Sequence, residues 1–453
     1  MNPTLLQIIR GIGAIAVSNV VGRLSSFTTV VLLTTALSLY EYGLVMLALA
    51  ITGPVLAIMS LGLDDMILAD TSRYLADGKR SHAKRMLVGY LSVKAVLLVA
   101  LIISGYFFRD FLATKYGTLI TDASLILLLY VVLQYFRTSY NTILHIHKRF
   151  KTLAFWNSIE PIARLIFVAV AFAVGGINVM VALASYVASS AVTIVGATPQ
   201  LLAIAKTYLK VPKLQQPLFR IAMKAHGKWQ SALSMLGSFT GAAGVYIIKY
   251  LLSTEAVAIF SVAQSMFSAI ASLTPIKTVM VPFISQWSTN KERLNQVLKK
   301  ITKYSMLMYG VIMIAAITIG PELIHVFFPK YTASILVFQI LSIRLLLNTF
   351  SITQSPTLTA LRDQKFMSGL SIFKLIMLVL LAPPLIMKFG VIGAVLEIII
   401  TTAIIELIRE WRLRTRYGIK TTTIQSFFTF DHIDRMILNR MKQFGHIIKQ
   451  KLK

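Results

Sequence analysis

The chain is divided along most of its length into apolar segments of about 20 residues or more, long enough to cross a lipid bilayer as helices. A bilayer interior offers no water to the backbone, so a crossing segment must form a helix or join a closed barrel, and segments of this length indicate helices. The chain has 453 residues, of which 56% are hydrophobic and 14% charged. The sequence therefore predicts an all-α polytopic membrane protein.

Twelve spans can be placed, and the Lys and Arg residues between them favour one side. The approximate bounds are 10–37, 42–63, 85–107, 119–141, 152–174, 177–199, 228–252, 256–284, 303–320, 333–358, 367–388 and 390–408. Connections after odd-numbered spans contain only Arg109, Lys115, Lys330 and Lys388, whereas the others are rich in cations. Cytoplasmic connections carry such an excess, so we expect both termini in the cytoplasm. The net charge of +28 thus needs no nucleic-acid partner.

An internal repeat divides the spans into two halves of six. The stretch from Tyr116 to Phe150 parallels the stretch from Tyr331 to Phe366: each opens with Tyr, runs apolar with one Arg, becomes rich in Ser, Thr and Asn, and ends basic with Phe. Repeats in the same order and orientation indicate a duplicated bundle. The small-residue runs that open the two halves, Gly11–Gly22 and Gly237–Gly244, are typical of close helix packing.

We expect three parts from this organisation: an N-terminal lobe with a cytoplasmic link over residues 1–226, a C-terminal lobe over 227–418, and a tail over 419–453. Apolar residues recur in the tail at steps of three or four, with Arg and Lys between them. This pattern predicts a basic amphipathic helix, resting either on the anionic membrane surface or on a partner protein.

Six cations lie well inside the spans: Arg23, Lys94, Arg164, Lys277, Arg344 and Lys374. Three more, Arg10, Arg137 and Lys249, lie close enough to span ends to extend into the headgroups. At roughly 2.5–3.5 kcal/mol for each central charge, exposing all six to lipid would cost on the order of 15–20 kcal/mol. That exceeds the roughly 5–15 kcal/mol by which a folded protein is usually stable. The six cations are therefore expected to face a wet cavity.

Only three carboxylates, Glu160, Glu397 and Glu406, fall clearly within the spans, so the interior keeps a surplus of positive charge. This surplus favours an anionic passenger, since a transporter of organic cations would show the opposite sign. Glu160 lies one helical turn from Arg164, either as a local ion pair or as a pair that opens when a phosphate competes for the arginine. Glu397 and Glu406 are candidates for proton or cation coupling, or counter-ions of Arg344 or Lys374.

Several classes of function are excluded by what the sequence lacks. There is no Cys, no phosphate-binding Walker loop, no nucleophile elbow and no cluster with the spacing of metal ligands. The longest connections on the poorly charged side, 108–118 and 321–332, are too short to form a catalytic domain. We therefore expect neither an enzyme nor a bound metal or cofactor.

The first two spans carry a family resemblance. The segment Gly22–Gly78 resembles the start of bacterial oligosaccharide-lipid flippases. The likeness lies in the turn Tyr40-Glu41-Tyr42-Gly43 and in the end of the second span at Leu61-Gly62-Leu63. These flippases form the polysaccharide branch of the multidrug/oligosaccharidyl-lipid/polysaccharide flippase superfamily. Phe260–Trp287 and Pro321–Leu347 are similar to its eighth to tenth spans. Relatives often have Pro before the first turn, where this chain has Ser38 and Leu39.

The resemblance implies two six-helix bundles that form a V and open alternately to each side of the bacterial inner membrane. It implies that the substrate is a sugar chain carried on undecaprenyl diphosphate and that the protein lies among membrane lipids. Polysaccharide polymerase or assembly proteins are candidate partners. From charge placement, the diphosphate is expected to bind Arg23, Arg164, Arg344 and Lys374, with Lys94 and Lys277. A drug or metabolite antiporter of the same superfamily, or a scaffold subunit of a polysaccharide assembly complex, are the alternatives.

Overall fold

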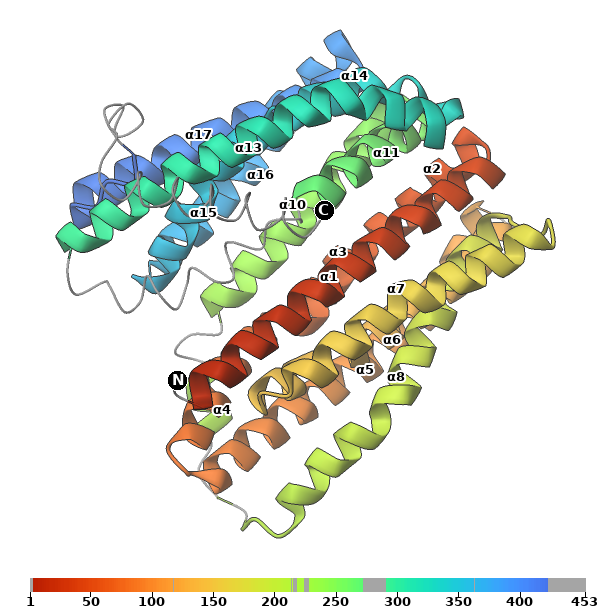
Figure 1. The fold of residues 1–453 in the computed structure, drawn as a ribbon. Helices are drawn as coiled ribbons and strands as arrows, with labels where there is room; N and C mark the ends of the chain where they lie inside the picture. Colours follow the sequence, from red (N-terminus) through yellow and green to blue (C-terminus); the bar gives the residue numbers. More distant parts are fainter. Residues whose placement is uncertain are drawn as a thin grey trace, which may run out of the picture.

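The computed structural model describes residues 3–116, 118–212, 214, 218–223, 228–271, 291–361 and 363–422 (Figure 1). These residues are helical apart from short turns, and no strand occurs among them. Eleven of their segments are long and apolar enough to cross a membrane. A further helix, α10 (Lys228–Leu251), also has spanning length. The expected all-α membrane fold of about twelve spans is confirmed.

The first bundle, the N-terminal lobe, consists of α1 (Pro3–Ala36), α2 (Leu39–Ala50), α3 (Thr52–Ser60), α4 (Leu63–Ala76), α5 (Arg80–Tyr116), α6 (Thr118–Ile146), α7 (Phe150–Ala173) and α8 (Val179–Leu209). The short α9 (Leu218–Ala222) packs on α5. The second bundle, the C-terminal lobe, consists of α10, α11 (Thr254–Ala271), α13 (Lys291–Phe327), the 3₁₀ turn η2 (Pro329–Tyr331), α14 (Ser334–Ser342), α15 (Arg344–Ala360), α16 (Gln364–Phe389) and α17 (Val391–Tyr417). The expected tail helix lies almost wholly outside the described residues.

Two of the expected spans are interrupted helices. The second span is α2 followed by α3, and it ends where Leu61 and Gly62 both adopt left-handed backbone conformations with φ of 47° and 60°. Glycine tolerates this conformation and leucine does not, so tertiary contacts must hold the turn. The tenth span is divided at Ile343 into α14 and α15. Arg344 is the first residue of α15, so a half-buried charge lies at a break in a membrane helix.

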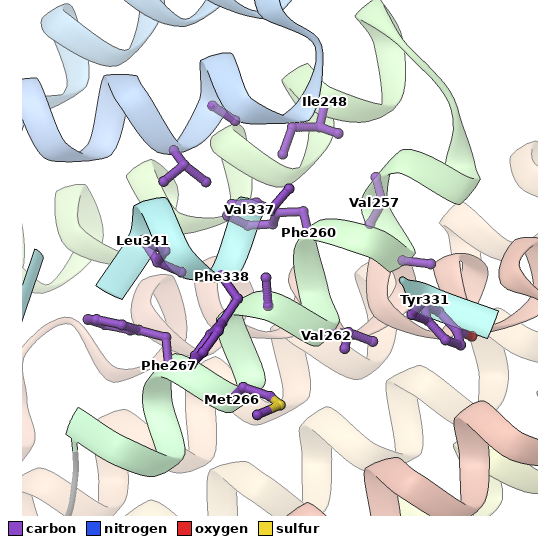
Figure 2. Close-up of a cluster of buried hydrophobic side chains, with 14 of the residues drawn as sticks. Ile248, Val257, Phe260, Val262, Met266, Phe267, Tyr331, Val337, Phe338 and Leu341 are labelled. Atoms are coloured by element: carbon purple, nitrogen blue, oxygen red, sulfur yellow. The ribbon is translucent and has the colours of Figure 1, made fainter. Parts of the chain in front are cut away.

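The lobes contact each other along α2 and α3, which pack on α11 and α10, and also at one end of the spans, which we call the closed end. The rings of Tyr42 and Tyr331 stack edge to face there at 5.9 Å, and Phe27 stacks on Phe328 at 5.8 Å. The Lys330 ammonium donates hydrogen bonds to carbonyls at the end of α1, including that of Thr35 at 2.7 Å. One hydrophobic core continues through this junction. Figure 2 shows residues that the C-terminal lobe contributes to it, among them Tyr331.

The two lobes approach each other closely where α2 meets α11. A Cβ added to Gly43 would lie 2.2 Å from the backbone oxygen of Thr254, so only glycine permits this approach. Away from the closed end α1 and α13 diverge (Figure 1), while α3 stays in contact with α10, where Ser231 donates a hydrogen bond to the carbonyl oxygen of Leu61. At the other ends of the helices, which we call the basic end, the connections carry Lys79, Lys148, Arg149 and Lys210.

Candidate functional site

Arg23 lies on the side of α1 that faces the other lobe. Phe27, one turn further along the same face, contacts Phe327 and Phe328 of the C-terminal lobe. Arg23 itself is exposed, and no carboxylate among the described residues pairs with it. Its cation is therefore available on the side of the N-terminal lobe where the two bundles begin to diverge.

Arg164 belongs to a compact cluster inside the N-terminal lobe. Its guanidinium donates to Glu160 Oε1 at 2.9 Å, which is the expected ion pair one turn apart, and it lies over the ring of Tyr186 at 3.9 Å. Arg137 Nε lies 2.7 Å from the second oxygen of Glu160. Gln134 donates to Glu160 Oε1 at 2.9 Å. Each carboxylate oxygen thus has an arginine of its own.

The role expected for Arg137 was wrong. The sequence placed it near a span end, from which it would reach the headgroups, but α6 continues to Ile146 and carries Arg137 inside the bundle. Glu160 is 2% exposed and shared between two arginines, so the cluster keeps one positive charge in excess. A buried carboxylate of this kind is stable only while its cations stay in place.

Lys94 differs from the expected accessible cation. Its side chain is 3% exposed, its ammonium lies 2.9 Å from Asp64 Oδ1, and the rings of Tyr90 and Tyr135 enclose it. It also donates to Thr138 at 2.9 Å. Asp64 was assigned to a polar connection by its sequence, but the turn at the end of α3 returns it to the helix bundle. The pair is neutral, so Lys94 is a structural residue here.

The C-terminal lobe brings together three of the expected residues from three different spans. Arg344 of α15, Lys374 of α16 and Glu397 of α17 all line one cavity of about 290 Å³, bounded by α10 and α11. Glu397 is 3% exposed and accepts a hydrogen bond from Thr401 at 2.7 Å. Lys374 also lines this cavity, although its side chain as a whole is exposed. We call this space the C-lobe cavity.

Charges near the C-lobe cavity are unequal in number. Arg344 interacts electrostatically with Glu397 and Glu406, and Lys374 does so with Arg344, Glu397 and Arg409. Glu406 is 5% exposed and forms an ion pair with Arg409 at 2.7 Å. Among the described residues, three cations therefore accompany two carboxylates. The cavity has the sign that an anionic ligand requires.

Arg344 retains hydrogen-bonding capacity that no described residue uses. Its Nε is buried and has no partner among the described residues. Its guanidinium lies 5.6 Å from the ring centre of Phe267, which fixes its plane without using a donor. An orphaned donor on an arginine beside an open space is suited to phosphate oxygens, which guanidinium binds in a bidentate manner.

The wall of the C-lobe cavity on α10 is built from glycine. Gly237, Gly241 and Gly244 line it, and a Cβ added to either of the first two would meet nothing within 4 Å. Close packing, which the sequence predicted for this run, is therefore wrong in the C-terminal lobe: the missing side chains leave room. In the N-terminal lobe the expectation holds at Gly22, whose Cβ would lie 3.3 Å from Pro161. Lys277 lies outside the described residues.

Comparisons with known families place the chain in context. Residues 8–288, more than half of the chain, match the family model described as polysaccharide biosynthesis protein. The recognition of the polysaccharide branch of the superfamily from the sequence is thereby confirmed. No curated protein matches the chain in sequence.

Solved structures share its fold at low sequence identity. An inward-facing multidrug resistance MATE family transporter of the MOP superfamily superposes with a TM-score of 0.71 at 14% identity, over 88% of this chain and 94% of that one. The lipid II flippase MurJ in its inward closed conformation gives 0.70 at 16%, over 91% and 89%. An outward-facing MATE family transporter gives 0.65 at 15%, over 90% and 95%.

Proposed function

The chain belongs to the polysaccharide biosynthesis protein family, and from this premise we propose that it is a flippase for a polyprenyl-diphosphate-linked oligosaccharide. It acts by alternating access across the bacterial inner membrane, with the basic end and both termini in the cytoplasm. The observation that carries the proposal is the C-lobe cavity, where Arg344 and Lys374 outweigh Glu397 in charge. The coarser class, a flippase or transporter of the MOP superfamily, follows from the family and the fold.

The size of the C-lobe cavity limits which part of the substrate it takes. At about 290 Å³ it lies at the lower end of the ~300–1,000 Å³ typical of ligand pockets. It suits a diphosphate, while an oligosaccharide must extend into the space between the lobes. Arg344 would bind phosphate oxygens through its free donor, and Lys374 would approach as a mobile point charge.

The remaining charges have graded roles in this proposal. Arg23 attracts the headgroup from the face of α1, and Arg164 is a secondary contact because it must first leave Glu160. Glu397 is the counter-ion that holds Arg344 and Lys374 before substrate arrives, and it also serves as a candidate for coupling to protons or cations. Diphosphate offsets the repulsion between Arg344 and Lys374, so its binding favours closure of the basic end.

A reconstituted flipping assay tests the proposal. Purified protein in liposomes is expected to expose a defined polyprenyl-diphosphate-linked sugar on the opposite leaflet, and Arg344→Ala is expected to stop this. In cells, Arg23→Ala and Arg344→Ala should each abolish polymer export at normal membrane levels of the protein. Full export by both variants would remove the argument from the cations.

A drug antiporter is the second candidate, because the fold also superposes on multidrug resistance MATE family transporters. The net positive charge of the C-lobe cavity argues against the transport of cationic drugs. Expression of the protein should therefore leave resistance to cationic dyes unchanged, and a rise in resistance together with intact export in Arg344→Ala would favour the antiporter.

A further inference from the structure

A second, larger hollow lies in the N-terminal lobe, between α5, α6 and α8. It measures about 710 Å³, and its walls are mainly aliphatic and aromatic, including Leu87, Leu91, Phe136, Ile194 and Leu201. That is several times the ~150 Å³ of an apolar cavity able to hold benzene. We call it the α5–α8 groove. A space of this size and composition forfeits packing contacts unless an apolar molecule fills it.

The α5–α8 groove is separate from the site proposed for the substrate. Its walls are α5, α6 and α8, whereas α1, α2 and α3 make the main contacts with the C-terminal lobe. Exposed apolar side chains continue from the groove onto the surface of the spans, among them Leu91, Phe136 and Leu202, which are 45%, 47% and 56% exposed. The medium at such a surface is the hydrocarbon of the bilayer. A lipid chain is therefore the molecule that can enter it.

The basic end of the groove has a rim of cations. Lys84 lines the groove and donates to the carbonyl oxygen of Val211 at 2.6 Å, which joins the start of α5 to the end of α8. Arg80 interacts electrostatically with Tyr208, another lining residue, and Lys206 is on the last turn of α8. None of the described lining residues is acidic. The rim thus complements a negative headgroup at the depth where a lipid would place it.

We propose that the α5–α8 groove is a binding site for one anionic phospholipid. An acyl chain lies along α6 between α5 and α8, and the phosphate lies at Arg80, Lys84 and Lys206. The lipid fills the space between α5, α6 and α8 and so stabilises the N-terminal lobe. The diphosphate-linked substrate is not the occupant, because the groove does not include Arg23, Arg344 or Lys374.

Lipid titration of the purified full-length protein tests this site directly. Dioleoyl phosphatidylglycerol or dioleoyl phosphatidylcholine is added in detergent, and native mass spectrometry counts the lipids bound. The variant Ala205→Trp fills the groove, and Ala203→Trp is the matched control, because both alanines are exposed on α8 but only Ala205 lines the groove. Thr198→Trp, at another exposed lining position, gives a second test should Ala205→Trp fail to fold.

The expected result is one phosphatidylglycerol bound more tightly than any phosphatidylcholine in the wild type and in Ala203→Trp, and lost from Ala205→Trp and Thr198→Trp. Arg80→Gln should weaken phosphatidylglycerol binding by about fivefold and leave phosphatidylcholine unchanged. Equal binding of the two lipids by the wild type, or unchanged phosphatidylglycerol binding in the filled variants, would show an ordinary lipid annulus and overturn the proposal. Flipping activity does not enter either outcome.

Discussion

Glu160 in the N-terminal lobe and Glu397 in the C-terminal lobe are 2% and 3% exposed, yet their surroundings differ. Glu160 is held by Arg137 and Arg164 at 2.7 and 2.9 Å, with Gln134 completing a closed network. Glu397 accepts from Thr401 on its own helix and shares a cavity with its cations. In the N-terminal lobe the buried glutamate holds two arginines in fixed ion pairs. In the C-terminal lobe the buried glutamate leaves Arg344 with an Nε donor that no described residue uses.

The largest expected effect is on stability, and it should separate the two glutamates. Glu160→Gln leaves two buried arginines without their carboxylate, which costs about 3–5 kcal/mol. Glu397→Gln should cost less than half of this, because Glu397 accepts a hydrogen bond from Thr401 and makes no direct ion pair with a described residue. Thermal unfolding of the two variants in the same detergent measures the difference. Equal losses would mean that the lobes do not differ in this respect.

Transport, in contrast to stability, should be most sensitive to substitutions in the C-terminal lobe. Arg344→Ala and Lys374→Ala each remove a charged partner of the substrate, worth about 1.5–3 kcal/mol, or a tenfold to hundredfold loss of flipping rate at low substrate. Lys388→Ala is the matched control, because Lys388 is an exposed lysine near the end of the same helix and does not line the C-lobe cavity. A loss of rate in the control equal to that in Lys374→Ala would make the effect one of general surface charge.

The closed end offers a smaller, conformational test. Lys330→Ala removes the bonds from the ammonium to the carbonyls of Thr35 and Leu37, at 2.7 and 3.3 Å, each worth about 0.5–1.5 kcal/mol net. The population open at this end should rise several-fold. Distances between spin labels on α2 and α14 report it, with Lys388→Ala again as control. An unchanged distance distribution would show that aromatic contacts alone close this end.

The smallest effect is expected at Gly241. Gly241→Ala should leave stability unchanged or raise it by up to ~1 kcal/mol, because alanine favours helix and the added Cβ meets open space. Gly43→Ala should destabilise the junction of α2 and α11, where Cβ would collide with the backbone of Thr254. Thermal unfolding compares the two. A destabilised Gly241→Ala variant would show that α10 packs closely there after all.

The helices and the presence of charges within the spans were predictable because hydropathy and charge cost act locally along the chain. The residues that pair with those charges were not predictable from the sequence. Asp64 was missed because two consecutive left-handed residues return it to the bundle, and nothing in the hydropathy marks that turn. Arg137 was misassigned because α6 extends beyond its apolar stretch.

Binding of undecaprenyl diphosphate to the purified protein tests the central claim most directly, since it requires neither transport nor an energy source. The account predicts saturable binding that Lys374→Gln weakens about tenfold, as loss of one charged contact implies, and that Lys388→Gln leaves unchanged. Equal affinity of wild type and Lys374→Gln would contradict the account, because the C-lobe cavity would then not be where the diphosphate binds.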